Sequence, residues 1–315
     1  MTRLIADIGG TYTRCALVDN NGRLGSMRVY ENNQFPDLAT TIETYIRQAS
    51  PAKRPEICAL GVAAPVTGDS VSMVNINWQF SINKLSQQLG LKALHVVNDF
   101  TALAYALPHL EEKDRVQIGS GQPKRGAVLA VLGPGTGFGM SALIPIDDGW
   151  EAIAGEGGHS TMPASTEEEW QIISASIQRF GHCSVERILS GPGLLDLFEI
   201  LSEQIGQRRR PSTPSEVTEL ARSGHTVAMK AMMCFFSMVG TVAGNLALTL
   251  GALGGVYIGG GIIPSEQELF ARSGFRAKFE DKGRYRDYMS RIPTYLITAE
   301  NPTLLGLKAV IEAHE

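Results

Sequence analysis

The chain has 315 residues, enough for about two domains that each bury a hydrophobic core. It carries 28 Lys and Arg against 32 Asp and Glu, and this net charge of -4 argues against a nucleic-acid-binding protein, whose surface would be basic. Its four cysteines form no CxxC pair, which excludes a zinc knuckle or CxxC redox motif and favours a reducing, cytoplasmic compartment.

Over the first hundred residues, short β-rich runs alternate with helical patterns, which is typical of an α/β domain. We expect strands at residues 3–8, 12–19, 28–30, 57–64 and 94–97. We expect helices at residues 36–49, 82–89 and 101–107, the first of them with one apolar face.

A polar stretch at residues 108–125 predicts the boundary between a small domain, residues 1–110, and a large domain, residues 111–300. The large domain opens with an apolar strand at 127–132. A final helix at 303–313, within residues 301–315, is expected to pack back on the small domain.

Two capping boxes predict helix starts in the large domain. Ser165 with Glu168 predicts a start near residue 166, and Thr213 with Glu216 predicts one near residue 214.

Residues 231–265 contain no charged side chain, and by length alone they imitate a membrane span. Eight glycines interrupt this stretch, and Thr241 and Asn245 add polar groups. The pattern therefore predicts a buried helix up to about Leu250, a GALGG break and a buried strand at 256–258. The N-terminal apolar run is short and is interrupted by Asp7, so neither an export signal nor a membrane partner is predicted.

Two glycine turns share one layout of strand, turn and strand: DIGGT at 7–11 and GPGTGFG at 133–139. Such turns let backbone N–H groups approach phosphate oxygens, and an Asp at a strand end can face a phosphate-bound Mg²⁺. Either turn alone is equally compatible with a plain β-hairpin. One turn in each half of the chain favours a nucleotide clamp, although neither fits the Walker or dinucleotide pattern.

Three further groups carry polar chemistry. Asn98 and Asp99 end an apolar strand, where open α/β sheets place ligands, although Asp99 is equally well explained as a helix N-cap. Glu156 and His159, in GEGGH, are exposed by glycines and suit a polyol better than a metal, which needs more ligands. Glu186 alone indicates no more than a helix carboxylate.

These residues stand in a series of motifs that closely resembles the bacterial glucokinases that lack the zinc-binding cysteine motif of the ROK family. The motifs run in order along nearly the whole chain: DIGGT at 7–11, PVTGD at 65–69, NxNWxFS at 75–81, NDFTALAYA at 98–106, GPGTGFG at 133–139, GEGGH at 155–159, ERILSGPGL at 186–194, GNLAL at 244–248, GGVYIGGGI at 254–262 and FRAKFEDKGR at 275–284.

The resemblance implies an actin-like ATPase fold, with two RNase H-like α/β domains flanking a catalytic cleft, usually in a homodimer. It implies that ATP is bound by Ala6, Asp7, Ile8, Gly9, Gly10, Thr11, Gly133, Gly135, Thr136, Gly137, Asn245, Gly260 and Gly261, with Asp7 facing Mg²⁺ through water. It implies that glucose is held by Asn98, Asp99, Glu156, His159 and Glu186, with the loop around Asn75 and Trp78 as part of the sugar-side wall.

The activity that the resemblance implies is transfer of the γ-phosphoryl group of ATP to O6 of glucose, in glycolysis, with Asp99 as the general base. Two alternatives remain: a kinase for another hexose, and a sugar-sensing regulator on the same scaffold. The regulator would need a DNA-binding appendage, for which a first strand at residue 3 leaves no room. Glycine turns do not distinguish ATP from ADP or polyphosphate as the donor.

Overall fold

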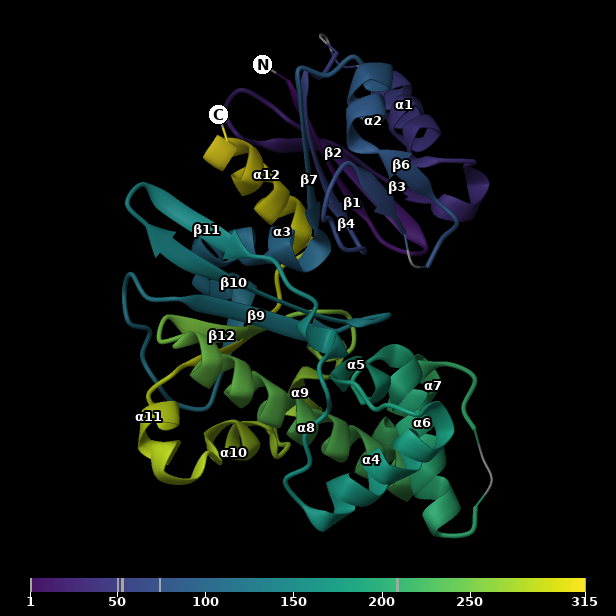
Figure 1. Ribbon diagram of the computed structural model, residues 1–315, viewed down its shortest axis with the longest axis vertical. Coiled ribbons are helices and arrows are strands. Elements are labelled where there is room, and N and C mark those ends of the chain that lie inside the picture. Colours follow the sequence, from purple (N-terminus) through teal and green to yellow (C-terminus); the bar gives the residue numbers. More distant parts are fainter. Residues whose placement is uncertain (1, 50, 52–53, 74, 208–209, 315) are drawn as a thin grey trace. The chain divides into compact units, whose positions relative to one another are not determined.

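The computed structural model describes residues 2–49, 51, 54–73, 75–207 and 210–314 (Figure 1). The chain divides into two compact units, residues 1–110, 146–155 and 299–315 in the first and residues 111–145 and 156–298 in the second. The predicted large domain included residues 146–155. In the structure this segment groups with the first unit because β11 (Gly149–Ile153) packs against α3 (Asp99–Ala106).

The first unit is built on a five-stranded sheet in the order β3-β2-β1-β4-β7. Its strands are β1 (Arg3–Ile8), β2 (Tyr12–Val18), β3 (Leu24–Glu31), β4 (Ile57–Val62) and β7 (Ala93–Asn98). The pairs β1–β2 and β2–β3 are antiparallel, whereas β1–β4 and β4–β7 are parallel. A small hairpin, β5 (Ser70–Ser72) with β6 (Gln79–Ser81), lies apart from this sheet.

Helices complete the first unit: α1 (Leu38–Ala49), α2 (Ile82–Leu89), α3 and the C-terminal α12 (Pro302–His314). Ile42 and Tyr45 of α1 share a buried core with Leu4 and Ile8 of β1, as the apolar face of this helix predicts. Helix α12 packs against α3 and lies along β4 and β1 (Figure 1).

A second sheet, built mainly from the second unit with β11 at its edge, repeats this strand order and runs β11-β10-β9-β12-β13-β8. Its strands are β8 (Arg115–Ile118), β9 (Leu129–Pro134), β10 (Phe138–Ile146), β12 (Gly255–Ile258) and β13 (Thr294–Ile297). Here β9 and β10 are antiparallel, and β9–β12 and β12–β13 are parallel. The first five strands in the order therefore match the first unit strand for strand.

Besides α8 (Thr226–Leu250), the second unit contains α4 (Glu167–Phe180), α5 (Val185–Ile188), α6 (Gly191–Gln204), α7 (Pro214–Arg222), α9 (Gln267–Ala271), α10 (Phe275–Glu280) and α11 (Arg286–Ser290). The predicted Ser165–Glu168 capping box is wrong by one residue. Thr166 is the N-cap of α4 and forms the box with Glu169, because a run of three glutamates and two adjacent hydroxyl residues offers both registers. Thr213 caps α7 as predicted.

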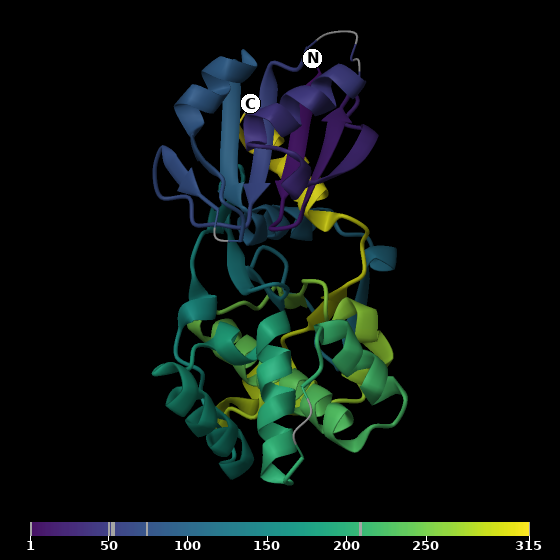
Figure 2. The ribbon, with the colours of Figure 1, turned by 90° about the vertical axis from the view of Figure 1, so that its right-hand side faces the viewer.

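The apolar stretch forms α8 (Thr226–Leu250), and Gly251 ends it at φ 61°, so the predicted helix, break and strand are confirmed. An 18-residue window of α8 has a mean hydropathy of 1.6, enough for a membrane span by that criterion, yet 67% of the window is buried. Figure 2 shows the ribbon turned by 90° from Figure 1. Helices α6, α7 and α10 pack against α8. Helix α8 is therefore the core helix of this unit.

Candidate active site

The carboxyl ends of three parallel strands meet at one edge of the first sheet. Ile8, Val62 and Asn98 are register partners across β1, β4 and β7. Neighbouring strands lie about 4.8 Å apart, so the backbone positions that precede Gly9 and Asp99, at Ile8 and Asn98, are about 10 Å apart. The fold of the first unit thus brings these two predicted groups to the same edge.

The DIGGT segment forms the turn of the β1–β2 hairpin, as predicted, and Gly9 N–H closes it by donating to Tyr12 O at 3.0 Å. Within the described part of the chain, the backbone N–H groups of Gly10 and Thr11 have no hydrogen-bond acceptor. A Cβ on Gly10 would lie 2.8 Å from Cβ of Asn75, so this predicted sugar-side residue abuts the turn. The turn therefore presents two uncommitted donors with Asn75 beside them.

Asn32 braces this turn and was missed in the sequence. Its side chain is bonded to Gly9 and Thr13, and its backbone N–H donates to Thr11 O at 2.9 Å. The signal was absent because the contacts span 19 and 23 residues, beyond any local pattern.

Asp7 is half-buried near the end of β1, and Nη1 of Arg14 lies 3.4 Å from its Oδ2. Burial raises the pKa of the Asp7 carboxyl, and the Arg14 guanidinium opposes that rise. No group of three or more His, Cys, Asp or Glu that could hold a metal occurs among the described residues. Mg²⁺ bound to ATP phosphates needs only one or two protein carboxylates, so Asp7 alone fits that role but not a resident metal site.

Asn98 is the N-cap of α3, which corrects the alternative that Asp99 caps this helix. Oδ1 of Asn98 accepts from Phe100 N–H at 2.9 Å, and its Nδ2 lies 3.4 Å from Ala64 O. Asp99 is the first helical residue, and its Oδ1 accepts from Phe100 N–H at 2.9 Å. The amide of Asn98 is thus committed to the backbone, and capping no longer explains Asp99.

The GPGTGFG segment forms the turn of the β9–β10 hairpin, also as predicted. Gly135 N–H donates to Gly137 O at 2.8 Å, and Gly135 O accepts from Gly191 N–H at the start of α6 at 2.9 Å. No heavy atom lies within 4 Å of the place where a Cβ of Gly135 would be, and its φ is not positive. Space beside Gly135 is therefore open.

The loop after β12 is joined to this hairpin by backbone hydrogen bonds. Gly259 N–H donates to Leu132 O at 2.9 Å, and Gly261 N–H donates to Pro134 O at 3.1 Å. A Cβ on Gly260 would collide with Pro134 O, and its φ of +85° also requires glycine. The predicted Gly260 and Gly261 therefore lie at the GPGTGFG turn, while Asn245 is exposed on the last turns of α8.

Glu186, in α5, also reaches the second hairpin. Its Oε2 accepts from Phe138 N–H at 2.9 Å and lies where a Cβ of Gly137 would be. Gly157 and Gly158, in the GEGGH loop, pack against Met140 and Phe138 at the start of the same strand. Both flanking residues of these glycines, Glu156 and His159, are exposed. The structure thus gathers Glu156, His159 and Glu186 around the beginning of β10.

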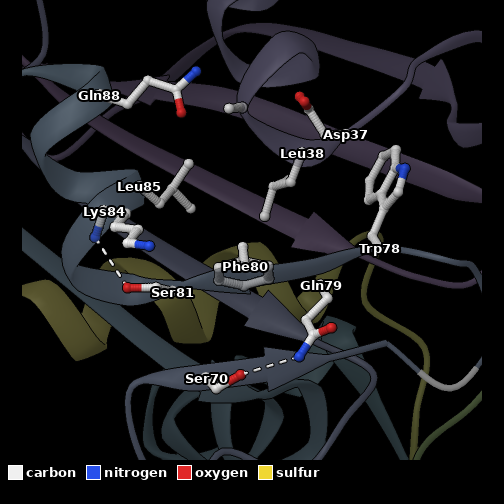
Figure 3. Close-up of a pocket in the computed structure, with 11 residues that line it drawn as sticks. Asp37, Leu38, Ser70, Trp78, Gln79, Phe80, Ser81, Lys84, Leu85 and Gln88 are labelled. Atoms are coloured by element: carbon white, nitrogen blue, oxygen red, sulfur yellow. Dashed lines mark hydrogen bonds between the residues drawn. The ribbon is translucent and has the colours of Figure 1, made fainter.

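Trp78 does not share the surroundings of Asn75. It is 5% exposed and lines a pocket of ≈ 420 Å³ in the first unit, between α1, α2 and the β5–β6 hairpin. Figure 3 shows Trp78 and Phe80 in this pocket beside Leu38 and Leu85. No predicted site residue other than Trp78 lines it.

Two units of matching strand order, with glycine hairpins β1–β2 and β9–β10 at equivalent places in the two sheets, define an actin-like ATPase fold of two RNase H-like domains. The glucokinase family model matches residues 4–314. The chain therefore belongs to the glucokinase family.

Relatives and solved structures agree with this family. A glucokinase of Nitrobacter hamburgensis is 46% identical over 306 residues, which cover 97% of this chain and 95% of the relative. The bifunctional protein glk of Burkholderia pseudomallei is also 46% identical, and the chain spans about half the length of that relative and of the others like it, 48% in this case.

Among solved structures, a glucokinase from an Antarctic psychrotroph has a TM-score of 0.88 at 32% identity and covers 99% of both chains. A ROK-family glucokinase of Streptomyces griseus, in complex with glucose and AMPPNP, has a TM-score of 0.69 at 19% identity, covering 98% of this chain and 99% of that one, and shares the fold.

Proposed function

We propose that this protein is a glucokinase, which transfers the γ-phosphoryl group of ATP to O6 of glucose. The observation that carries the proposal is the pair of glycine hairpins at equivalent strand ends, with Asp99 at the edge of one sheet and a glycine-exposed Glu156–His159 loop beside the other. The glucose and AMPPNP bound by the S. griseus glucokinase support these substrate classes.

Phosphoryl transfer asks the protein to position groups and to stabilise charge. In the proposed mechanism, Asp99 accepts the O6 proton as that hydroxyl attacks phosphorus, because a neutral hydroxyl is a poor nucleophile. N–H groups of Gly10, Thr11, Thr136 and Gly137 stabilise charge on the phosphate oxygens. Mg²⁺ bound to the nucleotide, with Asp7 as its carboxylate partner, would neutralise part of the same charge.

Sugar recognition is assigned to Glu156, His159 and Glu186, with Asn75 completing the wall. Carboxylates accept from hydroxyl groups, and a neutral imidazole both donates and accepts, so the set suits a polyol. The side-chain oxygen of Asn98 already accepts hydrogen bonds at the start of α3. Its proposed contact with the sugar would therefore use its other polar atoms. Contacts from Ala6 and Ile8 to the nucleotide would be made by the backbone, since both side chains are buried.

Asn245, Gly260 and Gly261 are assigned to the adenosine side. Cytoplasmic residence, a glycolytic role for the product and a homodimer complete the proposal, on the strength of the family. Light scattering of the purified protein tests the dimer, for which a mass of twice 34.0 kDa is expected.

A coupled assay over a panel of sugars and phosphoryl donors tests the proposed reaction. We expect ATP and glucose to give the highest kcat/KM, with mannose, fructose and N-acetylhexosamines well below glucose. Higher kcat/KM for another hexose would change the substrate. Absence of turnover with every pair, together with measurable sugar binding, would favour a sensor instead.

A further inference from the structure

Asn32 is a buried amide that ties three residues of the first glycine hairpin together. It follows β3 directly and is 1% exposed. Its Nδ2 donates to Gly9 O at 2.8 Å, its Oδ1 accepts from Thr13 Oγ1 at 2.7 Å, and its backbone N–H donates to Thr11 O at 2.9 Å. Alternate residues of the hairpin, 9, 11 and 13, are therefore all hydrogen-bonded to Asn32, which follows the neighbouring strand β3.

The chemistry of these contacts requires an amide. The carbonyl of Gly9 needs a donor, whereas the hydroxyl of Thr13 uses its own proton and needs an acceptor. An uncharged side chain that offers one of each, at this length, is asparagine. Aspartate has the same shape but only accepts, so it would face the Gly9 carbonyl with a lone pair and would add a buried charge.

The contacts of Asn32 leave the phosphate-facing groups untouched. They use the carbonyls of Gly9 and Thr11 and the side chain of Thr13, while the N–H groups of Gly10 and Thr11 find no acceptor in the described residues. Asn75 lies against Gly10, with Cβ 2.8 Å from where a Gly10 Cβ would be. The turn is thus held between two asparagines with its donors uncommitted.

We propose that Asn32 is a positioning residue for nucleotide binding: it fixes the Gly9–Thr11 turn in the conformation that receives the phosphates. This rests on the proposed function, because the turn must bind a nucleotide for its position to matter. A merely structural Asn32 would lower the melting temperature of every state alike and leave the nucleotide affinity of the folded protein unchanged. A positioning Asn32 changes that affinity while the sugar affinity stays.

Calorimetric titration of the folded proteins with AMPPNP and Mg²⁺ separates the two roles, and it needs no turnover. Asn32→Asp should raise the Kd for AMPPNP by about tenfold or more, and Asn32→Ala by a similar factor, because the Gly9 carbonyl loses its donor in both. Thr13→Val removes only the bond to Oδ1 and should raise Kd by about two- to threefold. The Kd for glucose should stay within about twofold of wild type in all three.

Thr294→Val is the matched control. Thr294 is fully buried in the second unit, and its Oγ1 donates to Ile118 O, so its loss destabilises the protein without touching the turn. It should lower the melting temperature and leave the AMPPNP affinity unchanged. If Asn32→Asp fails to fold, the graded pair Asn32→Ala and Thr13→Val carries the same test.

Folded Asn32 variants that bind AMPPNP within about twofold of wild type would overturn the assignment of Asn32 alone. Wild-type protein that does not bind AMPPNP at all would overturn the proposed function and this inference with it. The two failures are therefore distinguished by the wild-type titration.

Discussion

The two units share a strand order but not the chemistry at equivalent strand ends. In the first unit the third parallel strand, β7, runs into Asn98 and Asp99, whereas the equivalent strand of the second unit, β13, runs into Ile297 and Thr298. Both units supply a glycine hairpin, but only the first has a carboxylate, that of Asp99, directly after its third parallel strand. A repeated topology thus provides the proposed phosphate-binding turn twice and the proposed base once.

The two hairpins are also held by different means. One side chain, Asn32, holds the first. The second is held by backbone bonds from Gly261 and Gly191 and by the carboxylate of Glu186 on Phe138 N–H. A single substitution can therefore remove both side-chain bonds to the first turn, while the second is anchored from three directions.

The largest expected effect concerns the residues that follow the equivalent strands β7 and β13, which are Asp99 and Thr298. Asp99→Asn should lower kcat by ~10²–10⁴-fold with glucose binding largely retained, because asparagine cannot take up the proton. The melting temperature should change little, since Asn98 remains the N-cap of α3. Steady-state kinetics and thermal unfolding measure both quantities.

Thr298→Val, at the equivalent strand end, is the matched control and should keep near-wild-type kcat. Its backbone N–H still donates to Asp114 O, so the local structure should persist. An Asp99→Asn enzyme that retains more than about a tenth of wild-type kcat would remove Asp99 from the role of base.

The second hairpin is tested at Gly135, where a side chain would enter open space without backbone strain. Gly135→Val should fold normally but lose ATP binding measured by calorimetry, because the side chain would occupy phosphate space. Gly25→Val is the control, since Gly25 also lacks neighbours within 4 Å and lies on β3 opposite Leu17, outside both predicted nucleotide-binding turns. Normal ATP affinity in Gly135→Val would contradict the placement of the nucleotide.

Substitutions of Glu186 and Glu156 should have different effects on the KM for ATP, because only Glu186 also accepts a hydrogen bond from the second hairpin. Alanine at either position should raise the KM for glucose by about 10- to 100-fold, the worth of a hydrogen bond to a charged group. Glu186→Ala should also raise the KM for ATP, since Phe138 N–H loses its acceptor.

Glu186→Gln keeps an oxygen acceptor for that N–H, so it should restore the KM for ATP but not that for glucose. The comparison of Ala and Gln variants thus measures the two roles separately. Equal ATP KM values in Glu186→Ala and wild type would show that the Phe138 contact carries no weight in nucleotide binding.

The smallest expected effect concerns stability alone and should be confined to the second unit. Burial by itself raises the pKa of Glu169, but hydrogen bonds from Ser165 and the nearby Lys278 outweigh it, so the net pKa is lowered. The stabilisation is therefore complete above the ordinary pKa of 4.5 and is lost as pH falls through the lower folded value.

Glu169→Gln should cost about 1 kcal/mol in the free energy of unfolding at pH 7 and progressively less on acidification below that window. Urea unfolding at a series of pH values measures this, and kcat at pH 7 should be unchanged. A constant difference between variant and wild type across the acidic range would contradict the lowered pKa.

Elements of strong local pattern were predictable. Helix α2 has the predicted bounds, and the apolar periodicity of α1 is confirmed although that helix begins two residues later, at Leu38. The hairpin alternatives for both glycine turns are also correct as descriptions of local structure. Short-range chemistry of this kind depends on neighbours within a few residues, which a sequence displays directly.

Long-range contacts were not predictable. Asn32 and the Glu186–Phe138 bond join residues 19 to 48 positions apart, and neither residue type signals such a partner. The cap of α3 was ambiguous for another reason: Asn98 and Asp99 are both good N-caps, and only the backbone decides which one precedes the first turn.

Helix α8 has a consequence for the order of synthesis. Its partners lie on both sides of it in the chain: α6 and α7 precede it, whereas β12 and α10 follow. A nascent chain that has released α8 but not yet residue 280 exposes an apolar helix whose only charged side chain is Lys230. Between these points the incomplete chain exposes apolar surface that the finished protein buries, and such surface makes a nascent chain prone to aggregation.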